Sequence, residues 1–318
     1  MPTKESRRRF LQKLIATSGA LACFPSNGFA DESQRPNPDE WPIAIFEKVF
    51  EGLNYNELAK AVSETGADGI EATIRPSGHI EPEVAADEVP KMSEALKKRG
   101  CRIVIAATAV RSVDEPHSES LLKVLKEAGV THYRMGHYRL DLDKPMLPQL
   151  RNYTAQARDL AAMNQEIGIQ GLYQNHSGAS RKRGHLGALG WDAAMMLEGI
   201  SPEALGIAMD TRHLRKDTGS SWWVALAACK DHIRSIYVKD GIWKGPRGDQ
   251  YEDVPLDMGF VNEEVFSTIR SGLPPMPLCI HMEWMGYRIF SKPEIPSAVK
   301  AHQRDIRTLR KWMDFPEA

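Results

Sequence analysis

Eight short apolar segments, separated by amphipathic ones, constrain the fold of this chain more than any other feature of its sequence. Each apolar segment has the length and composition of a parallel strand that is buried on both faces. The eight segments span residues 43–49, 69–74, 102–107, 131–135, 169–173, 205–209, 233–238 and 278–282. Helical periodicity lies between them at residues 55–65, 89–99, 119–128, 147–167 and 189–197.

Glycines mark the ends of four predicted helices, each just before the next strand: Gly66, Gly100, Gly129 and Gly168. Glycine is favoured there because the chain often leaves a helix through a left-handed conformation. Eight strand–helix units predict an α/β fold with a single closed (β/α)8 TIM barrel. A doubly wound open sheet is the alternative. No Gly-x-Gly-x-x-Gly follows the first strand, and the number of units favours the closed barrel.

The N-terminus has the features of an export signal. Residues 6–11 read Ser-Arg-Arg-Arg-Phe-Leu, the apolar stretch 14–24 is too short to span a bilayer, and Gly-Phe-Ala at 28–30 suits cleavage. We predict a twin-arginine signal peptide at residues 1–30, a leader at 31–42 and a catalytic barrel at 43–318. The chain is then expected to use the twin-arginine export machinery and to act in the periplasm. A basic amphipathic helix, or a lipid anchor at Cys23, is the alternative.

The charge balance narrows the choice of partner. The 318 residues contain 41 Lys and Arg against 42 Asp and Glu, and removal of residues 1–30 lowers the formal charge from −1 to −5. Such a chain has no basic field for nucleic acid, so we expect a small-molecule partner. With 42% hydrophobic residues it should be globular, without stable membrane insertion after processing. No oligomeric state follows from the sequence. The remaining cysteines, Cys101, Cys229 and Cys279, are expected to be buried thiols.

Polar residues gather at the C-terminal ends of the predicted strands, where TIM-barrel active sites lie. They come from five strands and comprise Glu71, Gln174, Asn175, His176, Asp210, His213, Lys239, His281 and Glu283. His281 and Glu283 are two residues apart and therefore share one face of the eighth strand. A histidine or glutamate at a single strand end is as often structural, but convergence from five strands predicts one site.

These segments resemble the xylose isomerase-like, or sugar phosphate isomerase/epimerase, TIM barrels, which are related in fold to the endonuclease IV class. The resemblance covers essentially the whole mature chain. Its carriers are residues 69–71, 75–79, 173–178, 210–213, 238–240 and 281–283. It implies one divalent metal, held by Glu, Asp, His and Glu on strands five to eight. Asp210 and Glu283 match this pattern, whereas Gln174 replaces the first glutamate and the seventh strand has no histidine.

The resemblance and the chemistry of the side chains together suggest individual roles. Gln174, Asp210, His213 and Glu283 are the predicted ligands of a Mn, Mg or Zn ion, although a glutamine cannot act as a base. His176 is the preferred base for proton transfer, with Glu283 as its rival. Lys239 and Arg134 are expected to stabilise an enolate oxygen. The predicted substrate-binding residues are Glu71, His79, Arg134, Asn175, His281 and Trp243.

Three functions remain open at this point. The first is an isomerase or epimerase that moves a proton next to the carbonyl of a free carbohydrate. The second is a lyase or hydratase acting on keto sugars or keto-glycosides at the same site. The third is a sugar-binding barrel without catalysis. Endonuclease activity is disfavoured, because an acidic exported chain is poorly suited to bind DNA.

Overall fold

The computed structural model of the chain describes residues 36–178 and 182–316. The predicted signal peptide at residues 1–30 and part of the leader lie outside this range, so export stays a prediction. Within the described ranges, every helix is too short or too polar to cross a membrane.

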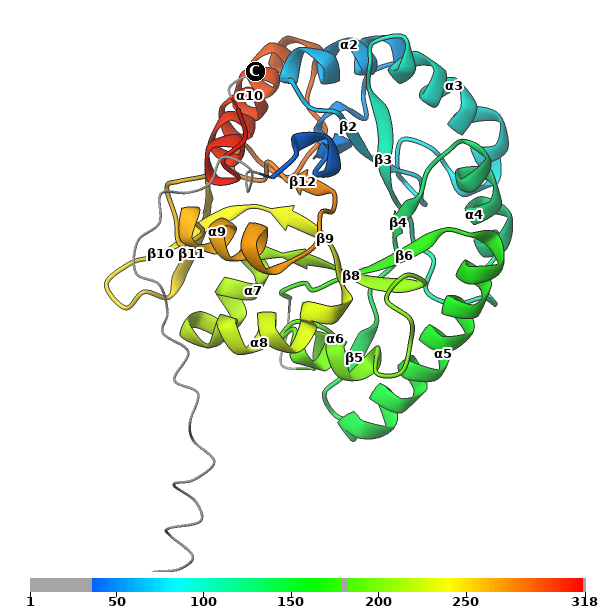
Figure 1. Cartoon of the computed structure of the whole chain (residues 1–318), viewed down its shortest axis with the longest axis vertical. Helices are drawn as coiled ribbons and strands as arrows, with labels where there is room; N and C mark the ends of the chain where they lie inside the picture. The colour runs from blue at the N-terminus through cyan, green and yellow to red at the C-terminus, as the bar shows by residue number, and fades with distance from the viewer. Residues whose placement is uncertain (1–35, 179–181, 317–318) are drawn as a thin grey trace, which may run out of the picture. The chain divides into compact units, whose positions relative to one another are not determined.

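Eight parallel strands close into a barrel in the order β1-β12-β9-β8-β6-β4-β3-β2, which confirms the predicted closed barrel (Figure 1). Each predicted apolar segment overlaps one of these strands. Their bounds are β1 Ile43–Phe46, β2 Gly69–Thr73, β3 Arg102–Ala107, β4 His132–Arg134, β6 Gln170–Gln174, β8 Leu205–Asp210, β9 Ile233–Val238 and β12 Leu278–Ile280.

Helices cover the outside of the barrel (Figure 1). They are α2 Tyr55–Thr65, α3 Ala85–Lys97, α4 Ser118–Glu127, α5 Met146–Ile167, α6 Trp191–Met196, α7 Thr211–Thr218, α8 Trp222–Cys229, α9 Glu263–Gly272 and α10 Ile295–Trp312. The five predicted helices match α2 to α6, with ends that differ by up to four residues. Gly66 and Gly168 cap α2 and α5 with φ angles of 80° and 76°, the left-handed conformation expected from the sequence.

Two antiparallel strand pairs, neither of which was predicted, extend from the strand ends. β5 (Arg139–Asp141) pairs with β7 (Arg183–His185), which follows it only after α5 and β6, and β10 (Asp240–Lys244) pairs with β11 (Gln250–Val254) in a β-hairpin. Asp240 anchors this hairpin, because its carboxylate accepts backbone hydrogen bonds from Gly241, Gly259 and Val261 at 2.7–2.9 Å. This hairpin follows β9 directly and supplies residues to the mouth of the barrel.

The barrel interior is apolar at its centre and polar toward the C-terminal ends of the strands. Small and medium side chains such as Ala44, Val104, Leu172 and Ala208 fill the centre. The larger core lies between the strands and the surrounding helices. Cys101, Cys229 and Cys279 are free and buried, as predicted.

Candidate active site

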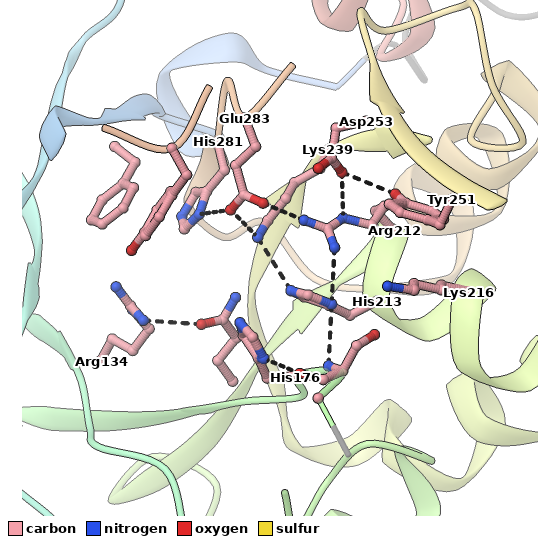
Figure 2. A pocket seen from close by; sticks show the side chains of 15 residues that line it. Arg134, His176, Arg212, His213, Lys216, Lys239, Tyr251, Asp253, His281 and Glu283 are labelled. Carbon is pink, nitrogen blue, oxygen red and sulfur yellow. Dashed lines mark hydrogen bonds and ion pairs between the residues drawn. The ribbon is translucent and has the colours of Figure 1, made fainter. Parts of the chain in front are cut away.

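A pocket of about 380 Å³ opens at the C-terminal ends of the barrel strands (Figure 2). Seven of the side chains nominated from the sequence line it: Arg134, Gln174, His176, His213, Lys239, His281 and Glu283. They come from strands β4 and β6, from the start of α7 and from the segments that follow β6, β9 and β12. The fold therefore brings residues more than 140 positions apart to one cavity.

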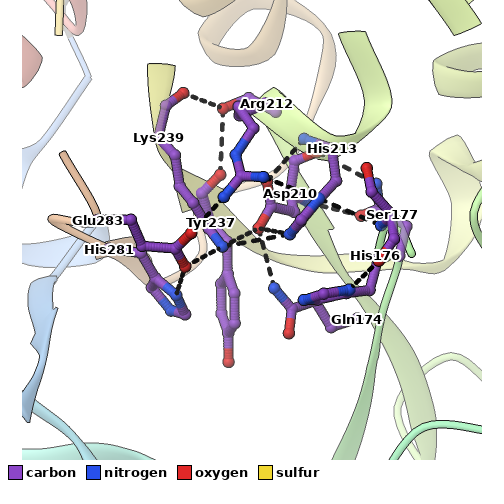
Figure 3. Close-up of polar contacts among 12 residues, drawn as sticks. Gln174, His176, Ser177, Asp210, Arg212, His213, Tyr237, Lys239, His281 and Glu283 are labelled. Carbon is purple, nitrogen blue, oxygen red and sulfur yellow. Dashed lines mark hydrogen bonds and ion pairs between the residues drawn. The ribbon is translucent and has the colours of Figure 1, made fainter. Parts of the chain in front are cut away.

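Lys239 lies at the centre of a network of charged side chains (Figure 3). Its Nζ donates to Oε1 of Glu283 at 2.7 Å and is 3.0 Å from Oδ2 of Asp210. Only 3% of the Lys239 side chain and none of the Asp210 side chain is exposed. An ammonium group between two carboxylates at these distances is a strong, partly desolvated ion pair.

Arg212 provides the second cation of this network. Its Nη2 donates to Oε2 of Glu283, and its Nε lies 3.2 Å from Oδ1 of Asp253. The guanidinium also lies over the ring of Tyr251, 5.5 Å from the ring centre. Although burial alone would raise the pKa of Glu283, Lys239 and Arg212 hold it well below its usual value. Glu283 is therefore a fully ionised, ion-paired carboxylate.

Asp210 is positioned by the start of α7 and by the neighbouring strand. As the N-cap of α7, it accepts a hydrogen bond from the backbone N–H of His213 at 3.0 Å. The Asn175 side chain accepts from the backbone N–H of Asp210 at 2.6 Å and donates to its carbonyl at 3.1 Å. Asn175, predicted to bind substrate, is fully buried and does not line the pocket.

A second polar cluster lies deeper in the barrel, around Glu71. Oε1 of Glu71 accepts hydrogen bonds from Arg134 and Tyr237, each at 2.6 Å, and Oε2 lies 2.7 Å from Nε2 of His281. Arg134 also donates to Oε1 of Gln174 at 3.0 Å, whereas its buried Nη2 has no partner among the described residues. Glu71 itself is fully buried below the pocket lining.

His176 and His213 stand side by side at the pocket, with ring centres 4.0 Å apart. Nδ1 of His176 is hydrogen-bonded to the Ser177 carbonyl, so this nitrogen carries a proton and Nε2 is left as an acceptor. Burial, reinforced by the positive charge of Lys239, lowers the pKa of His176 to about 4. His176 is thus a neutral imidazole at pH 7.

Besides Glu71 and Asn175, two further residues predicted to bind substrate do not line the pocket. His79 is hydrogen-bonded to Glu47 and to the Leu53 carbonyl, both at 3.1 Å. Trp243 lies on the hairpin strand β10, where 46% of it is exposed, and it does not line the cavity. His79 follows β2 and Trp243 lies on the hairpin of β10 and β11, but neither side chain lines the pocket.

Several pocket residues were not assigned a role from the sequence: Phe46, Arg212, Lys216, Tyr251, Asp253 and Tyr287. The sequence could have indicated Arg212 as a pocket residue, because it lies between the two nominated residues of the Asp-Thr-Arg-His segment. Lys216 follows one turn later on α7. Tyr251 and Asp253 come from the hairpin that the sequence did not predict, so no pattern pointed to them.

The predicted metal ligands contact other charged groups of the protein. Lys239 holds the space between Asp210 and Glu283, and the carbonyl oxygen of Gln174 is turned toward Arg134. As these side chains stand, they do not offer a divalent ion a coordination position. A different group, Glu71, Cys279 and His281, has potential ligand atoms within 4.8 Å of one another and is compatible with a metal.

Comparison with known proteins agrees with the fold. The model of the xylose isomerase-like TIM barrel family matches residues 59–312. No curated protein matches the sequence significantly. The probable 3-DHS dehydratase AsbF of Bacillus anthracis is a similar solved structure, with a TM-score of 0.63 and 14% identity, covering 85% of this chain and 98% of its own.

Two further solved structures have similar scores. The 3-keto-D-glucoside 4-epimerase YcjR of E. coli has a TM-score of 0.61 and 16% identity, covering 85% of this chain and 99% of its own. A xylose isomerase-like TIM barrel protein of Mycobacterium smegmatis in complex with magnesium has a TM-score of 0.60 and 14% identity, covering 86% and 98%. At these identities the likeness establishes the fold.

Proposed function

Because the chain belongs to the xylose isomerase-like TIM barrel family, we propose that it is a carbohydrate isomerase or epimerase that transfers a proton next to a sugar carbonyl. One observation carries this proposal. The neutral imidazole of His176, with a free Nε2, lines the same pocket as the cations Lys239 and Arg212. A base and fixed positive charges around one cavity are the two requirements of enolisation.

The reaction begins with His176. Its Nε2 takes the proton from the carbon next to the carbonyl. The electron pair of the broken C–H bond forms a carbon–carbon double bond, and the π pair of the carbonyl moves onto its oxygen. The cations Lys239 and Arg212, which line the same pocket, would stabilise the resulting enolate oxygen. In an isomerase, the proton of the neighbouring hydroxyl passes to this oxygen, and the imidazolium returns its proton to the former carbonyl carbon. In an epimerase, a second acid protonates the carbon from the opposite face. Glu283 positions the two cations, because both of its oxygens are bound to them.

The lining of the pocket supports a carbohydrate substrate. Phe46, Tyr251 and Tyr287 provide aromatic surfaces on which the C–H face of a sugar can pack. Nη2 of Arg134 is buried without a partner among the described residues, and a sugar oxygen would satisfy it. Among similar folds, the epimerase of E. coli is named for a 3-keto-D-glucoside. No step of the proposed reaction uses a divalent metal, because Lys239 holds the predicted position.

A lyase or hydratase reaction is the second candidate, and one feature of the site favours it. Of the two candidate bases, Glu283 is held through both oxygens by Lys239 and Arg212, which leaves His176 as the single base. A single base can form the enolate and expel a leaving group from the next carbon, whereas epimerisation also needs a proton donor on the opposite face. The similar fold of a probable dehydratase is consistent with this alternative.

Deuterium exchange distinguishes these functions. The protein would be incubated in heavy water with D-fructose, D-psicose and 3-keto-glucosides, and the products analysed by mass spectrometry and NMR. Isomerisation or epimerisation should place one deuterium next to the carbonyl without another change in mass, whereas a hydratase adds the elements of water.

The control for this experiment is a histidine outside the pocket. His117 is partly exposed at the start of α4, so His117→Asn should keep the exchange rate of the wild type. His176→Asn should lose exchange. Tight binding of these sugars without exchange or turnover would instead favour the non-catalytic barrel.

A further inference from the structure

An ammonium group stands where the sequence suggested a divalent ion. Nζ of Lys239 lies 3.0 Å from Oδ2 of Asp210 and 2.7 Å from Oε1 of Glu283. Nε2 of His213 is 3.3 Å from the same nitrogen. Three of the four predicted metal ligands therefore surround Lys239 (Figure 3).

The surroundings of His213 are a second feature. Its Nδ1 accepts a hydrogen bond from the backbone N–H of Ser177 at 3.1 Å, and Nη1 of Arg212 lies 3.3 Å from the same nitrogen. Its Nε2 lies 3.3 Å from the Lys239 ammonium and 3.7 Å from Oδ2 of Asp210. N–H donors therefore face both ring nitrogens. In a metal-bound histidine, one ring nitrogen binds the metal and the other donates its proton to an acceptor, so His213 lacks the arrangement of a metal ligand.

Gln174, the fourth predicted ligand, is also oriented away from this role. Its Oε1 accepts from Nη1 of Arg134 at 3.0 Å, and its Nε2 donates to Oδ2 of Asp210 at 2.9 Å. The opposite amide orientation would set an N–H group against a guanidinium, which has no acceptor. The only ligand atom of Gln174 is thus committed to Arg134.

The charges of the buried part of this network already balance. Asp210 and Glu283 carry two negative charges, and Lys239 and Arg212 carry two positive charges, whereas the further partner of Arg212, Asp253, is 30% exposed. A divalent ion added to them would leave an excess of two positive charges away from water, which is unfavourable. Without Lys239, the same carboxylates would have an excess negative charge and would attract a cation.

We propose that the Lys239 ammonium replaces a divalent metal in this site and keeps metal ions out of it. Lys239 lines the pocket, so the same charge is available to a substrate oxygen. This inference goes beyond the proposed function, because it concerns which cation the site holds whatever the substrate is. It predicts that removal of the ammonium exposes a metal site formed by Asp210 and Glu283.

The experiment is a titration with Mn²⁺ in the absence of substrate. Binding is measured by calorimetry and by the electron paramagnetic resonance signal of free Mn²⁺. Lys239→Met removes the charge and keeps a side chain of similar size. We expect this variant to bind one Mn²⁺ about 100-fold more tightly than the wild type. Adding Asp210→Asn to it should abolish the gain.

Two control variants separate this mechanism from a general effect of charge. Lys239→Arg keeps the positive charge and should exclude Mn²⁺ as the wild type does. Lys216→Met removes a lysine that lines the same pocket but has no carboxylate within ion-pair distance among the described residues, so it should not gain Mn²⁺ binding. An equal gain in Lys216→Met would overturn the proposal.

Two other results would also overturn it. One is that the wild-type protein binds one Mn²⁺ and the Asp210→Asn variant does not. The other is a Lys239→Met variant that is folded by circular dichroism and gains no affinity. If Lys239→Met does not fold, the titration of wild type and Asp210→Asn decides the question alone. Since no substrate is present, the outcome is independent of whether the isomerase assignment holds.

Discussion

Arg134 on β4 donates from Nε to Oε1 of Glu71 on β2 at 2.6 Å, across the barrel interior. The two strands are not neighbours in the barrel, because β3 lies between them. Both side chains are buried, so each charge depends on the other for compensation. Burial alone would raise the pKa of Glu71, but Arg134 and His281 hold it well below its usual value. This pair forms the charged floor beneath the pocket.

The first prediction concerns the stability of that pair. Glu71→Gln leaves the Arg134 guanidinium buried without its carboxylate, so the free energy of unfolding should fall by about 3–5 kcal/mol. Urea unfolding at pH 7 measures this change. The double variant Glu71→Leu, Arg134→Met removes both charges and should recover part of the loss. A loss below about 1 kcal/mol in Glu71→Gln would contradict the role of the pair.

The second prediction compares the two candidate bases. His176→Asn should lower kcat by about 100- to 10,000-fold, with little change in KM or in the melting temperature. Glu283→Gln should lower both kcat and the melting temperature, because Lys239 and Arg212 lose a shared partner. Steady-state kinetics and thermal unfolding measure both variants. Near-wild-type rates for both would rule out this assignment of the base and its positioning residue.

The third prediction is the pH dependence of the reaction. Burial and the charge of Lys239 lower the pKa of His176 to about 4, and only the unprotonated ring can accept a proton. The value of kcat/KM should therefore rise as the pH increases through about 4. Deprotonation of His176 should give no further rise near neutral pH. Rates measured from pH 3.5 to 8 test this expectation. A rise centred near pH 6.5 would show that the ring titrates as an exposed histidine does.

The fourth prediction is a loss of stability in acid that originates at His302 on α10. This ring is fully buried against Phe50, and burial lowers its pKa to about 4. The unfolded chain takes up this proton near pH 6.5, whereas the folded protein does not. The stability from His302 is therefore complete above pH 6.5 and is lost as the pH falls toward 4.

His302→Gln tests this prediction, because the amide can still donate to the Ala298 carbonyl as Nδ1 of His302 does. The difference in unfolding free energy between pH 7 and pH 4.5 should shrink by about 2–3 kcal/mol in the variant. Urea unfolding at the two pH values measures it. An unchanged difference would place the acid sensitivity in other groups.

The fifth prediction concerns export, which rests on the sequence alone. Changing Arg7 and Arg8 together to Lys should leave the chain in the cytoplasm and prevent cleavage after Ala30. Cell fractionation and the mass of the purified protein give the readout. The matched control is Arg9→Lys, which lies outside the arginine pair and should be exported normally. Export of the Arg7, Arg8 variant by the same route would refute the assignment.

Much of the fold could be read from local patterns. The apolar runs of the strands, the helical stripes and the glycines at helix ends all act over a few residues, and they correctly predicted the eight-stranded barrel. The hairpin of β10 and β11 was missed because these strands are partly exposed and lack the apolar run that marks the barrel strands. Tyr251 and Asp253 were missed with them.

The pocket residues could likewise be predicted only in part from the sequence. The strand ends of a barrel meet at one mouth by topology, so Arg134, Gln174, His176, Lys239 and Glu283 could be grouped before any coordinates were known. Whether a side chain at a strand end faces the pocket or its own loop depends on the path of that loop. His79 lies six residues after β2 and packs against Glu47, whereas His176 lies two residues after β6 and lines the pocket.

The sequence by itself determined the strand–helix order, the closure of the barrel and the strand ends at which polar chemistry collects, because each depends on local periodicity and on connectivity. Only the tertiary structure decided which cation lies between Asp210 and Glu283 and which groups face the two ring nitrogens of His213. Those features depend on distances of about 3 Å between atoms of different strands. Such distances arise only when the strands are packed together.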